Sequence, residues 1–547
     1  MRNHLGFHVV LKQLVAASAV YLSAASANAQ SIQLQPTDSA NPVALPSEIE
    51  AQLDDPFFKI VVKPHPQVQQ LQQIIDLVQD RPSDRKLFVV GEHIGMTLQS
   101  GCSASRRTVM AFSGTNKKSG LVLDNNVFFS FFLSPIGPTG DLEVIAWDQK
   151  NGTYNYYRLD SAGAPKGQKT WKLRNISTDL RTASPKQLSG SCLRCHVNGG
   201  PVMKEFSFPW NNWHSSQFRA SYLQRGQSSP ATEWPSAKLP ILQQLSNAEQ
   251  LEAIIQSSLQ RFADSEINRH LQLNADGSTS AINLTRLLSG VFQPTELNLV
   301  SSATKSGLDG GPLTSPATSP IKIPDSFFVN IGMMRDLGLP ALKAPSNVAQ
   351  GFTAGDRGLS LAEYRTLTAK SNVPCLNGQD TIFAWFGPEI SEFDRTMVAR
   401  LVQRRILDPG FVAAVLAIDL ENPMFSDSRA GLLKHVPDSV TNVPSDGIAG
   451  AIQKQVIANL EAVPAANRSA AENDLLDLLT SNKALDALNQ RVEAYWQRVQ
   501  QSLDPANPTA RQDKLGALFR TLQANRDEFR NRPISTHLVE SDSLFPN

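Results

Sequence analysis

The stretch LEVIAWDQKNGTYNYYRLD, residues 142–160, contains two runs of β-branched and aromatic residues that are separated by Lys150-Asn151-Gly152. The flanking runs have the composition of strands. Asn-Gly suits the positive backbone φ angles of a tight turn between two strands. The stretch therefore predicts a β-hairpin that turns at residues 150–152.

Shorter runs of the same kind precede this hairpin, and Gly, Asn, Asp or Pro residues separate them. They read KLFVVGE from Lys86 onward, then RTVMAF, GLVLD and VFFSFFL. Together with the hairpin they predict an antiparallel β-rich domain over residues 86–175. Residues 46–80 have helical spacing instead, so we expect residues 30–85 to form an N-terminal helical cap.

Beyond Thr182 the apolar residues recur at helical spacing. Ser246-Asn-Ala-Glu249 is a capping box, which predicts the start of a helix. The segment 301–326 is rich in Ser, Thr, Gly and Pro and is typical of a linker. Two apolar stripes predict packed helix faces: Leu251, Ile254, Ile255, Leu259 and Phe262 in one, and Leu485, Leu488, Val492, Trp496, Val499 and Leu503 in the other.

The fold class predicted from these patterns is α+β. An antiparallel β-rich N-terminal region is followed by mainly α-helical regions at residues 176–300 and 327–547. The chain of 547 residues is too long for one ordinary core, which favours several domains. Its net charge of +1 leaves no basic excess, so no nucleic-acid partner is expected.

The first residues have the features of a secretory signal peptide. Arg2 and Lys12 are basic, residues 14–27 are mostly apolar, and Ala27-Asn28-Ala29 fits a cleavage site. The apolar run is shorter than the roughly 20 residues of a membrane span. We therefore expect residues 1–29 to be a cleaved signal peptide, and the mature chain to be periplasmic without a membrane span.

The sequence SCLRCHVNGG, residues 191–200, contains Cys192 and Cys195 with His196 directly behind. Cys-x-x-Cys-His is the attachment sequence of c-type haem. Thiols at i and i+3 lie on one side of a helical turn, where each can bond one vinyl group of the same porphyrin. The adjacent imidazole then binds the iron as proximal ligand. We predict one covalent haem c in residues 176–300, held by these three side chains.

Three other interpretations of the cysteine pair remain. A thioredoxin-type redox pair does not require the histidine that follows the second cysteine. A zinc site needs two more ligands at short spacing, and no second Cys-x-x-Cys occurs. A structural disulfide across two residues is strained. Export into an oxidising compartment, where bacteria attach haem covalently, favours the haem interpretation.

Residues 192–196 resemble the haem motif of c-type cytochromes. In that family a proline carbonyl beyond the motif accepts the Nδ1–H of the proximal imidazole. The resemblance implies this role for Pro201 or for another hydrogen-bond acceptor close to His196. A sheet followed directly by the motif, over residues 86–200, also resembles the order in cytochrome c′-beta and its hydroxylamine-oxidising relatives.

The sixth ligand of the iron is predicted from proximity in the sequence. His214 is the nearest histidine after the motif and is our candidate distal ligand. His93, Met96 and Met203 are alternatives, and an open or water-bound iron is a further one. Cys102 and Cys375 either form a disulfide or are two separately buried thiols.

These observations lead to three hypotheses. The first is an exported mono-haem c-type cytochrome that transfers electrons to or from a redox partner. The alternative is a periplasmic haem enzyme, an oxidoreductase of peroxidase, nitrogen-oxide or apolar-substrate type, or a haem-based sensor. The sequence does not identify the partner or the substrate.

Overall fold

The structure is a computed structural model of the whole chain. The statements below concern the residues that it describes. These are residues 32–35, 41–79, 81–92, 105–134, 137–162, 164, 166–181, 191–194, 196, 198–201, 246, 248–295, 297–301, 333–334, 337, 386–390, 392–421, 426–502, 506–507, 509–510 and 513.

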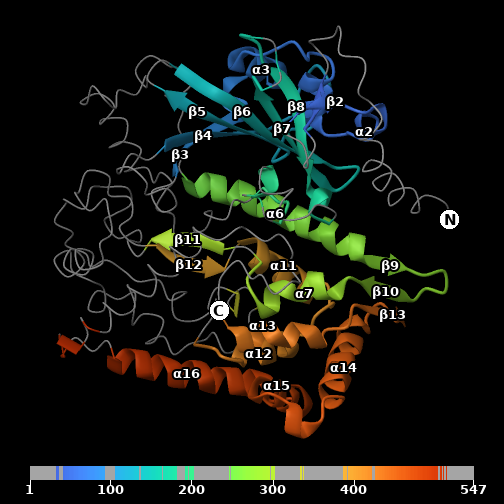
Figure 1. Cartoon of the computed structure of the whole chain (residues 1–547), viewed down its shortest axis with the longest axis vertical. Helices are drawn as coiled ribbons and strands as arrows, with labels where there is room; N and C mark the ends of the chain where they lie inside the picture. Colours follow the sequence, from blue (N-terminus) through green and yellow to red (C-terminus); the bar gives the residue numbers. More distant parts are fainter. Residues whose placement is uncertain are drawn as a thin grey trace.

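An eight-stranded sheet forms the N-terminal body (Figure 1), with the strand order β2-β1-β8-β7-β6-β5-β4-β3. Its pairs are antiparallel except β1 with β8, which is parallel. The predicted α+β class with a β-rich N-terminal region is confirmed. The strands are β1 (Gln33–Leu34), β2 (Val43–Ala44), β3 (Arg85–Glu92), β4 (Ser105–Phe112), β5 (Val127–Ser134), β6 (Gly137–Asp148), β7 (Thr153–Asp160) and β8 (Thr170–Ile176).

The hairpin predicted for residues 142–160 is present as β6 and β7. Its turn is closed by the Gly152 N–H, which donates to the Asp148 carbonyl at 2.8 Å. Gly152 has a φ of +64°, and a Cβ there would lie 2.1 Å from the Ser265 hydroxyl. The turn therefore requires glycine, both for its backbone conformation and for its close approach to the helix that contains Ser265.

The N-terminal segment covers one face of the sheet. It contains α2 (Ser47–Glu50), a π-helical turn at Phe58–Val62 and α3 (Leu71–Val78). The fully buried Phe57 ring lies 5.4 Å from Phe129 and 5.2 Å from Trp171 of the sheet, centroid to centroid. The sequence predicted helices here but not β1 and β2, which add two residues each to the edge of the sheet.

Helix α6 (Ala248–His270) covers the opposite face of the sheet, as Figure 1 shows. The ring of Phe262 lies 5.6 Å from Tyr154 and 6.4 Å from Trp147, centroid to centroid. The Arg261 guanidinium stacks 4.7 Å from the Trp147 ring. The predicted apolar stripe of this helix is confirmed, since Leu251, Ile255, Leu259 and Phe262 are buried and Ile254 is partly buried.

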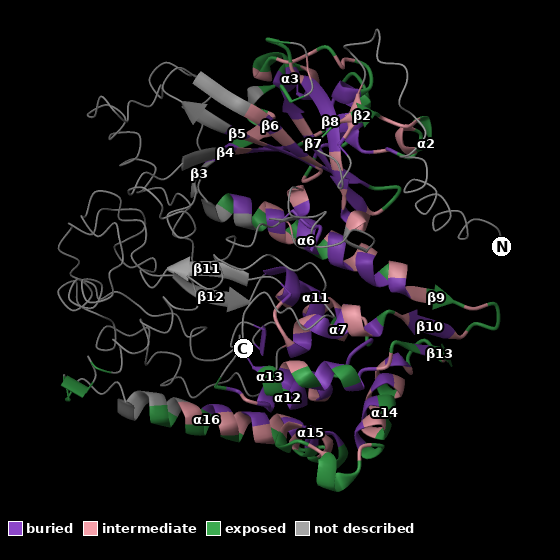
Figure 2. Ribbon diagram, viewed as in Figure 1, coloured by how far each residue is buried: buried purple, intermediate pink, exposed green. Residues whose placement is uncertain are grey.

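The remaining described helices pack below α6 in the view of Figure 1. α12 is buried at every residue from Phe411 to Ala417, and Figure 2 shows how burial concentrates between the elements. Leu488 and Val492 of the predicted C-terminal stripe are buried. The helices are α7 (Leu284–Phe292), α11 (Glu392–Gln403), α12 (Pro409–Ala417), α13 (Asp427–Ala430), α14 (Ile448–Glu461), α15 (Ala470–Ser481) and α16 (Ala484–Ser502).

Two small sheets join segments that are far apart in the chain. β10 (Thr279–Ile282) pairs with β9 (Leu271–Leu273) and with β13 (Ser439–Val443). β11 (Leu297–Ser301) pairs with β12 (Phe386–Ile390). The two predicted helical regions therefore share sheets, and the linker predicted at 301–326 lies outside the described residues except for Ser301. In the described part of the chain, no helix is long and apolar enough to span a membrane.

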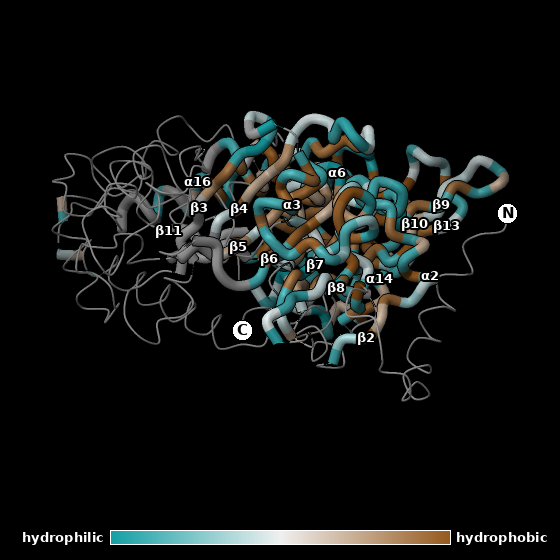
Figure 3. The backbone as a smooth tube through the Cα atoms, turned by 90° about the horizontal axis from the view of Figure 1, so that it is seen from above, coloured by the Kyte–Doolittle hydropathy of each residue, from teal (hydrophilic) through white to brown (hydrophobic). Residues whose placement is uncertain are grey.

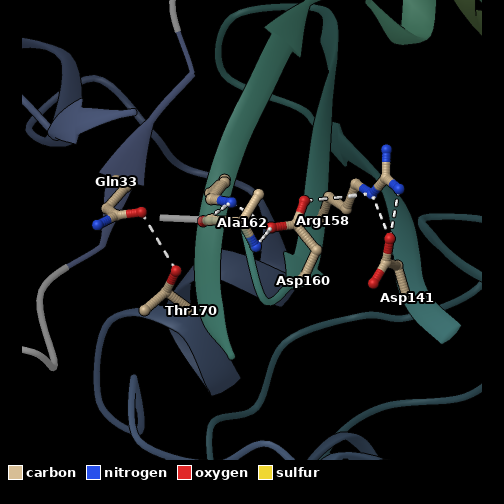
Figure 4. A network of polar contacts seen from close by, with 7 residues as sticks. Gln33, Asp141, Arg158, Asp160, Ala162 and Thr170 are labelled. Carbon is tan, nitrogen blue, oxygen red and sulfur yellow. Dashed lines mark hydrogen bonds and ion pairs between the residues drawn. The ribbon is translucent and has the colours of Figure 1, made fainter. Parts of the chain in front are cut away.

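A buried ion-pair network holds the end of the β7–β8 pair (Figure 4). Lys172, whose side chain is fully buried, donates to the Asp160 carboxylate and to the Ala162 carbonyl. Asp160 lies 3.3 Å from the Arg158 guanidinium, which also binds Asp141. Removal of one partner would leave a buried charge uncompensated, so we assign this network a structural role. Figure 3, turned by 90° from Figure 1, shows hydrophobic stretches in brown among the strands labelled β6, β7 and β8.

Candidate functional site

The described part of the Cys-x-x-Cys-His sequence forms a single helical turn. Cys192–Arg194 is a 3-10 turn, and the His196 N–H donates to the Cys192 carbonyl at 3.1 Å. Leu193 is fully buried, whereas Cys192 and His196 are partly exposed. The buried leucine fixes the turn to the body, and the candidate cysteine and histidine stay partly exposed beside it. Cys195 lies outside the described residues.

The imidazole of His196 is oriented by a backbone carbonyl. Its Nδ1 lies 3.0 Å from the Gly200 oxygen. A carbonyl oxygen only accepts hydrogen bonds, so Nδ1 carries the proton and the neutral ring has its lone pair on Nε2. This is the tautomer of a histidine that binds a metal through Nε2. The acceptor implied near Pro201 is therefore the carbonyl of the residue before it.

The same carbonyl receives a second hydrogen bond. The Tyr156 hydroxyl donates to the Gly200 oxygen at 2.9 Å. Its ring lies 5.3 Å from the His196 ring, centroid to centroid, with the planes inclined by 50°. Tyr156 is buried in β7, so the phenol comes from a rigid part of the fold. Gly200 thus links the candidate ligand to the sheet.

The loop behind the motif, residues 198–201 (the motif loop), is held between the sheet and α6. Gly199 has a φ of +74° and its N–H donates to the His196 carbonyl at 2.8 Å. Its own carbonyl accepts from the Ser177 hydroxyl at 2.7 Å. On the other side, a Cβ at Gly200 would lie 3.2 Å from the Phe262 ring. Glycines at both positions therefore allow the turn and the close approach of α6.

A β-bulge in β8 aims a polar side chain at the motif. Leu173 pairs with Tyr157 and Asn175 pairs with Tyr156, so Arg174 is the additional residue. Because neighbouring residues of β7 lie on opposite faces, the bulge moves Asn175 to the face opposite Leu173. The Asn175 Oδ1 accepts from the Cys192 N–H at 3.0 Å.

Asp179 fixes the orientation of the Asn175 amide. Its carboxylate accepts from the Asn175 Nδ2 at 3.2 Å and from the Ile176 N–H at 2.9 Å. Burial raises the pKa of Asp179 to about 6, against these two hydrogen bonds, which lower it. The amide oxygen of Asn175 is then directed toward Cys192.

A chain of hydrogen bonds connects the loop to the C-terminal helices. Asn198 donates from Nδ2 to the Thr295 hydroxyl at 3.1 Å. The Thr295 hydroxyl and N–H both donate to the Asp394 carboxylate in α11, the N–H at 2.9 Å. All three side chains are buried. The residue two positions beyond His196 is thus tied to a helix almost 200 residues away in the sequence.

A second buried polar site lies on the opposite face of β7. The fully buried Asp55 accepts from the Tyr157 hydroxyl at 2.5 Å, from the Asn155 Nδ2 at 2.8 Å and from the Phe58 N–H at 2.8 Å. Burial raises the pKa of Asp55 to about 6, and the three hydrogen bonds only partly offset it. The buried Asp148 carboxylate also raises it. This site fastens the N-terminal segment to the sheet.

Several residues predicted from the sequence lie outside the described residues. These are the candidate distal ligand His214, the alternatives His93, Met96 and Met203, and the cysteines Cys102 and Cys375. Within the described ranges, no group of three or more His, Cys, Asp or Glu side chains is arranged to hold a metal ion.

The supporting residues of the site were missed in the sequence. Tyr156 follows Tyr154 at the spacing of two that places side chains on one face of a strand, and this signal was available. Asn175 depends on a bulge, and Thr295 and Asp394 depend on contacts between distant segments. Neither the bulge nor the contacts between distant segments produce a local pattern in the sequence.

Comparison of the chain with known protein families, curated proteins and solved structures gave no match. The functional interpretation therefore depends on the residues of the site.

Proposed function

We propose that this protein is an exported mono-haem c-type cytochrome that binds haem covalently and transfers electrons in the periplasm. One observation carries the proposal. His196, the last residue of a Cys-x-x-Cys-His sequence, donates its Nδ1–H to the Gly200 carbonyl, as is typical of a proximal ligand that binds iron through Nε2.

The described residues fit a haem c group. Cys192 lies at the start of a helical turn and is partly exposed, and its thiol would supply one thioether bond. Cys195 would supply the second thioether and His196 Nε2 the bond to iron. When bound, haem c supplies one-electron Fe(III)/Fe(II) chemistry.

The protein residues keep the proximal ligand in one orientation. Gly200 and Tyr156 fix the imidazole, and Ser177 and Phe262 hold the loop from its two sides. A ligand that is positioned in advance by a packed environment need not reorganise when the charge of the site changes. This favours electron transfer, in which the same geometry serves both oxidation states.

The binding of carbon monoxide tests the activity. The protein is secreted from a bacterium that contains the c-type haem maturation system, purified, reduced and exposed to carbon monoxide. Electron transfer predicts an absorption spectrum that carbon monoxide leaves unchanged, together with reversible one-electron reduction. Rapid binding of carbon monoxide would contradict electron transfer and support the haem enzyme or sensor.

His214 is proposed as the distal ligand. His214→Ala should convert a low-spin, six-coordinate spectrum into a high-spin spectrum that responds to carbon monoxide. His93→Ala is the matched control and should remain low-spin. A low-spin spectrum in the His214→Ala variant would assign the distal position to another residue.

The periplasmic location is proposed from the signal sequence at residues 1–29. N-terminal sequencing of the exported protein should begin at or near Gln30. An intact Met1 in the purified protein would contradict it.

A further inference from the structure

The Gly200 carbonyl is shared by two donors. The His196 Nδ1 and the Tyr156 hydroxyl lie 3.0 and 2.9 Å from its oxygen. A carbonyl oxygen has two lone pairs, so these two bonds use its full accepting capacity. The strength of either bond then depends on the presence of the other.

The fold fixes both Tyr156 and the loop that contains the Gly200 carbonyl. Tyr156 is 1% exposed in the centre of β7, and Gly199, Gly200 and Pro201 are buried. Gly199 is held by Ser177, and Gly200 packs against Phe262. These contacts hold the loop beside the phenol, so the carbonyl stays within reach of both donors.

The phenol changes the donor strength of the histidine. A hydrogen bond from Nδ1–H to a strong acceptor makes an imidazole a more basic ligand. A basic ligand stabilises the more highly charged ferric state and lowers the reduction potential. Donation by Tyr156 draws electron density from the Gly200 oxygen, weakens its acceptance from Nδ1–H and opposes this effect.

We infer that Tyr156 is a positioning residue that raises the reduction potential of the haem by sharing the Gly200 carbonyl with His196. The inference rests on the proposed function, because it concerns the same haem site. It gives one side chain of the sheet a role that the haem motif does not contain.

Tyr156→Phe tests the inference by removing the hydroxyl and keeping the ring. The midpoint potential should fall, with the reduction equilibrium constant decreasing by roughly two- to tenfold, where tenfold is about 59 mV for one electron. Tyr154→Phe is the matched control. Tyr154 is a buried tyrosine on the same face of β7, and its hydroxyl bonds the Ser258 carbonyl of α6 at 3.5 Å instead of the motif loop. The midpoint potential of the Tyr154→Phe variant should equal that of the wild type.

A second variant changes only the strength of the donor. Incorporation of 3-fluorotyrosine at position 156 makes the phenol more acidic and strengthens its bond to Gly200. The potential should then rise, opposite to Tyr156→Phe. A purely structural role would lower thermal stability in the Phe variant without these opposite shifts, and the fluorinated variant decides the question if the Phe variant fails to fold.

The outcomes separate the inference from the proposed function. A wild-type protein without covalent haem would overturn both. If the wild type contains haem c and both the fluorinated variant and Tyr156→Phe have the wild-type potential, the inference alone is overturned. A fall in the fluorinated variant together with a rise in Tyr156→Phe would overturn it too. Opposite shifts in the two variants, with Tyr154→Phe unchanged, support it.

Discussion

The two faces of β7 carry out different tasks with similar side chains. On one face, Tyr154 and Tyr156 point toward α6 and the motif loop, and their hydroxyls meet neutral carbonyl groups. On the other face, Asn155 and Tyr157 donate to the buried Asp55 carboxylate. A single strand with alternating side chains therefore orients a candidate haem ligand and fastens the N-terminal segment.

The chemical difference between the faces lies in their acceptors. A backbone carbonyl does not titrate, so the hydrogen bond from Tyr156 to Gly200 does not depend on the protonation state of its acceptor. Burial raises the pKa of Asp55 to about 6, so the other face changes with pH. The acceptor of the ligand-orienting tyrosine is therefore independent of pH. Each face nevertheless has a carboxyl group whose pKa is raised to about 6, Asp55 on one face and Asp179 behind Asn175 on the other.

The largest expected effect comes from removing one aromatic anchor on each face. Phe262→Ala and Phe57→Ala should each lower the free energy of unfolding by about 3–5 kcal/mol, because both rings are buried among aromatic neighbours. Urea unfolding measures this. Leu273→Ala is the control: its side chain is 78% exposed, and the change should stay within about 0.5 kcal/mol.

The same two variants also distinguish the two faces of β7. Of the two phenylalanines, Phe262 lies against Gly200 and Phe57 lies on the opposite face of the sheet, so of the two variants only Phe262→Ala should change the midpoint potential of the haem-loaded protein. An equal change of potential in Phe57→Ala would show that the faces are not separate.

The second prediction concerns the pH dependence of stability. The pKa of Asp55 is about 6 in the folded protein and 3.8 in the reference state. The folded state therefore holds this proton more tightly, and its contribution is complete below pH 3.8 and lost as the pH rises through 6. The loss is about 3 kcal/mol in the free energy of unfolding.

Asp55→Asn isolates this contribution, because the amide stays neutral. The free energy of unfolding of the wild type minus that of the variant should fall by about 2.4 kcal/mol between pH 4 and pH 7, most of the full change of about 3 kcal/mol. Urea titrations at both pH values measure it. A difference that is constant with pH would contradict a raised pKa of Asp55 in the folded protein.

The smallest expected effect concerns the link from the motif loop to α11. Thr295→Val removes the hydroxyl that joins Asn198 to Asp394, and should lower the free energy of unfolding by about 2 kcal/mol. Thr480→Val, on the exposed surface of α15, is the matched control and should change it by less than about 0.5 kcal/mol. Equal effects in thermal unfolding would mean that the link adds nothing to stability.

The features that the sequence predicted correctly are local. The β6–β7 hairpin follows from alternating residues around Asn151-Gly152, and the buried face of α6 follows from helical spacing. The strands β1 and β2 were missed because two residues are too short to show alternation. A local pattern is sufficient where neighbouring residues in the chain determine the conformation.

The residues that orient the candidate site could not be predicted from such local patterns. The sequence indicated an acceptor near Pro201, but whether Gly200 or Pro201 faces the imidazole depends on how the loop packs against Phe262. The orientation of Asn175 depends on one additional residue in β8. Both are set by tertiary packing, which a single sequence does not display.

The most direct test is the mass of the intact exported protein after acid–acetone extraction, which removes non-covalent haem. The proposal predicts a mature chain that is heavier by one haem, and the bare chain mass for the Cys192→Ala, Cys195→Ala double variant. Cys102→Ala, a cysteine outside the motif, should keep the haem mass. A wild-type protein with the bare chain mass, or a double variant that retains haem, would contradict covalent attachment at this motif.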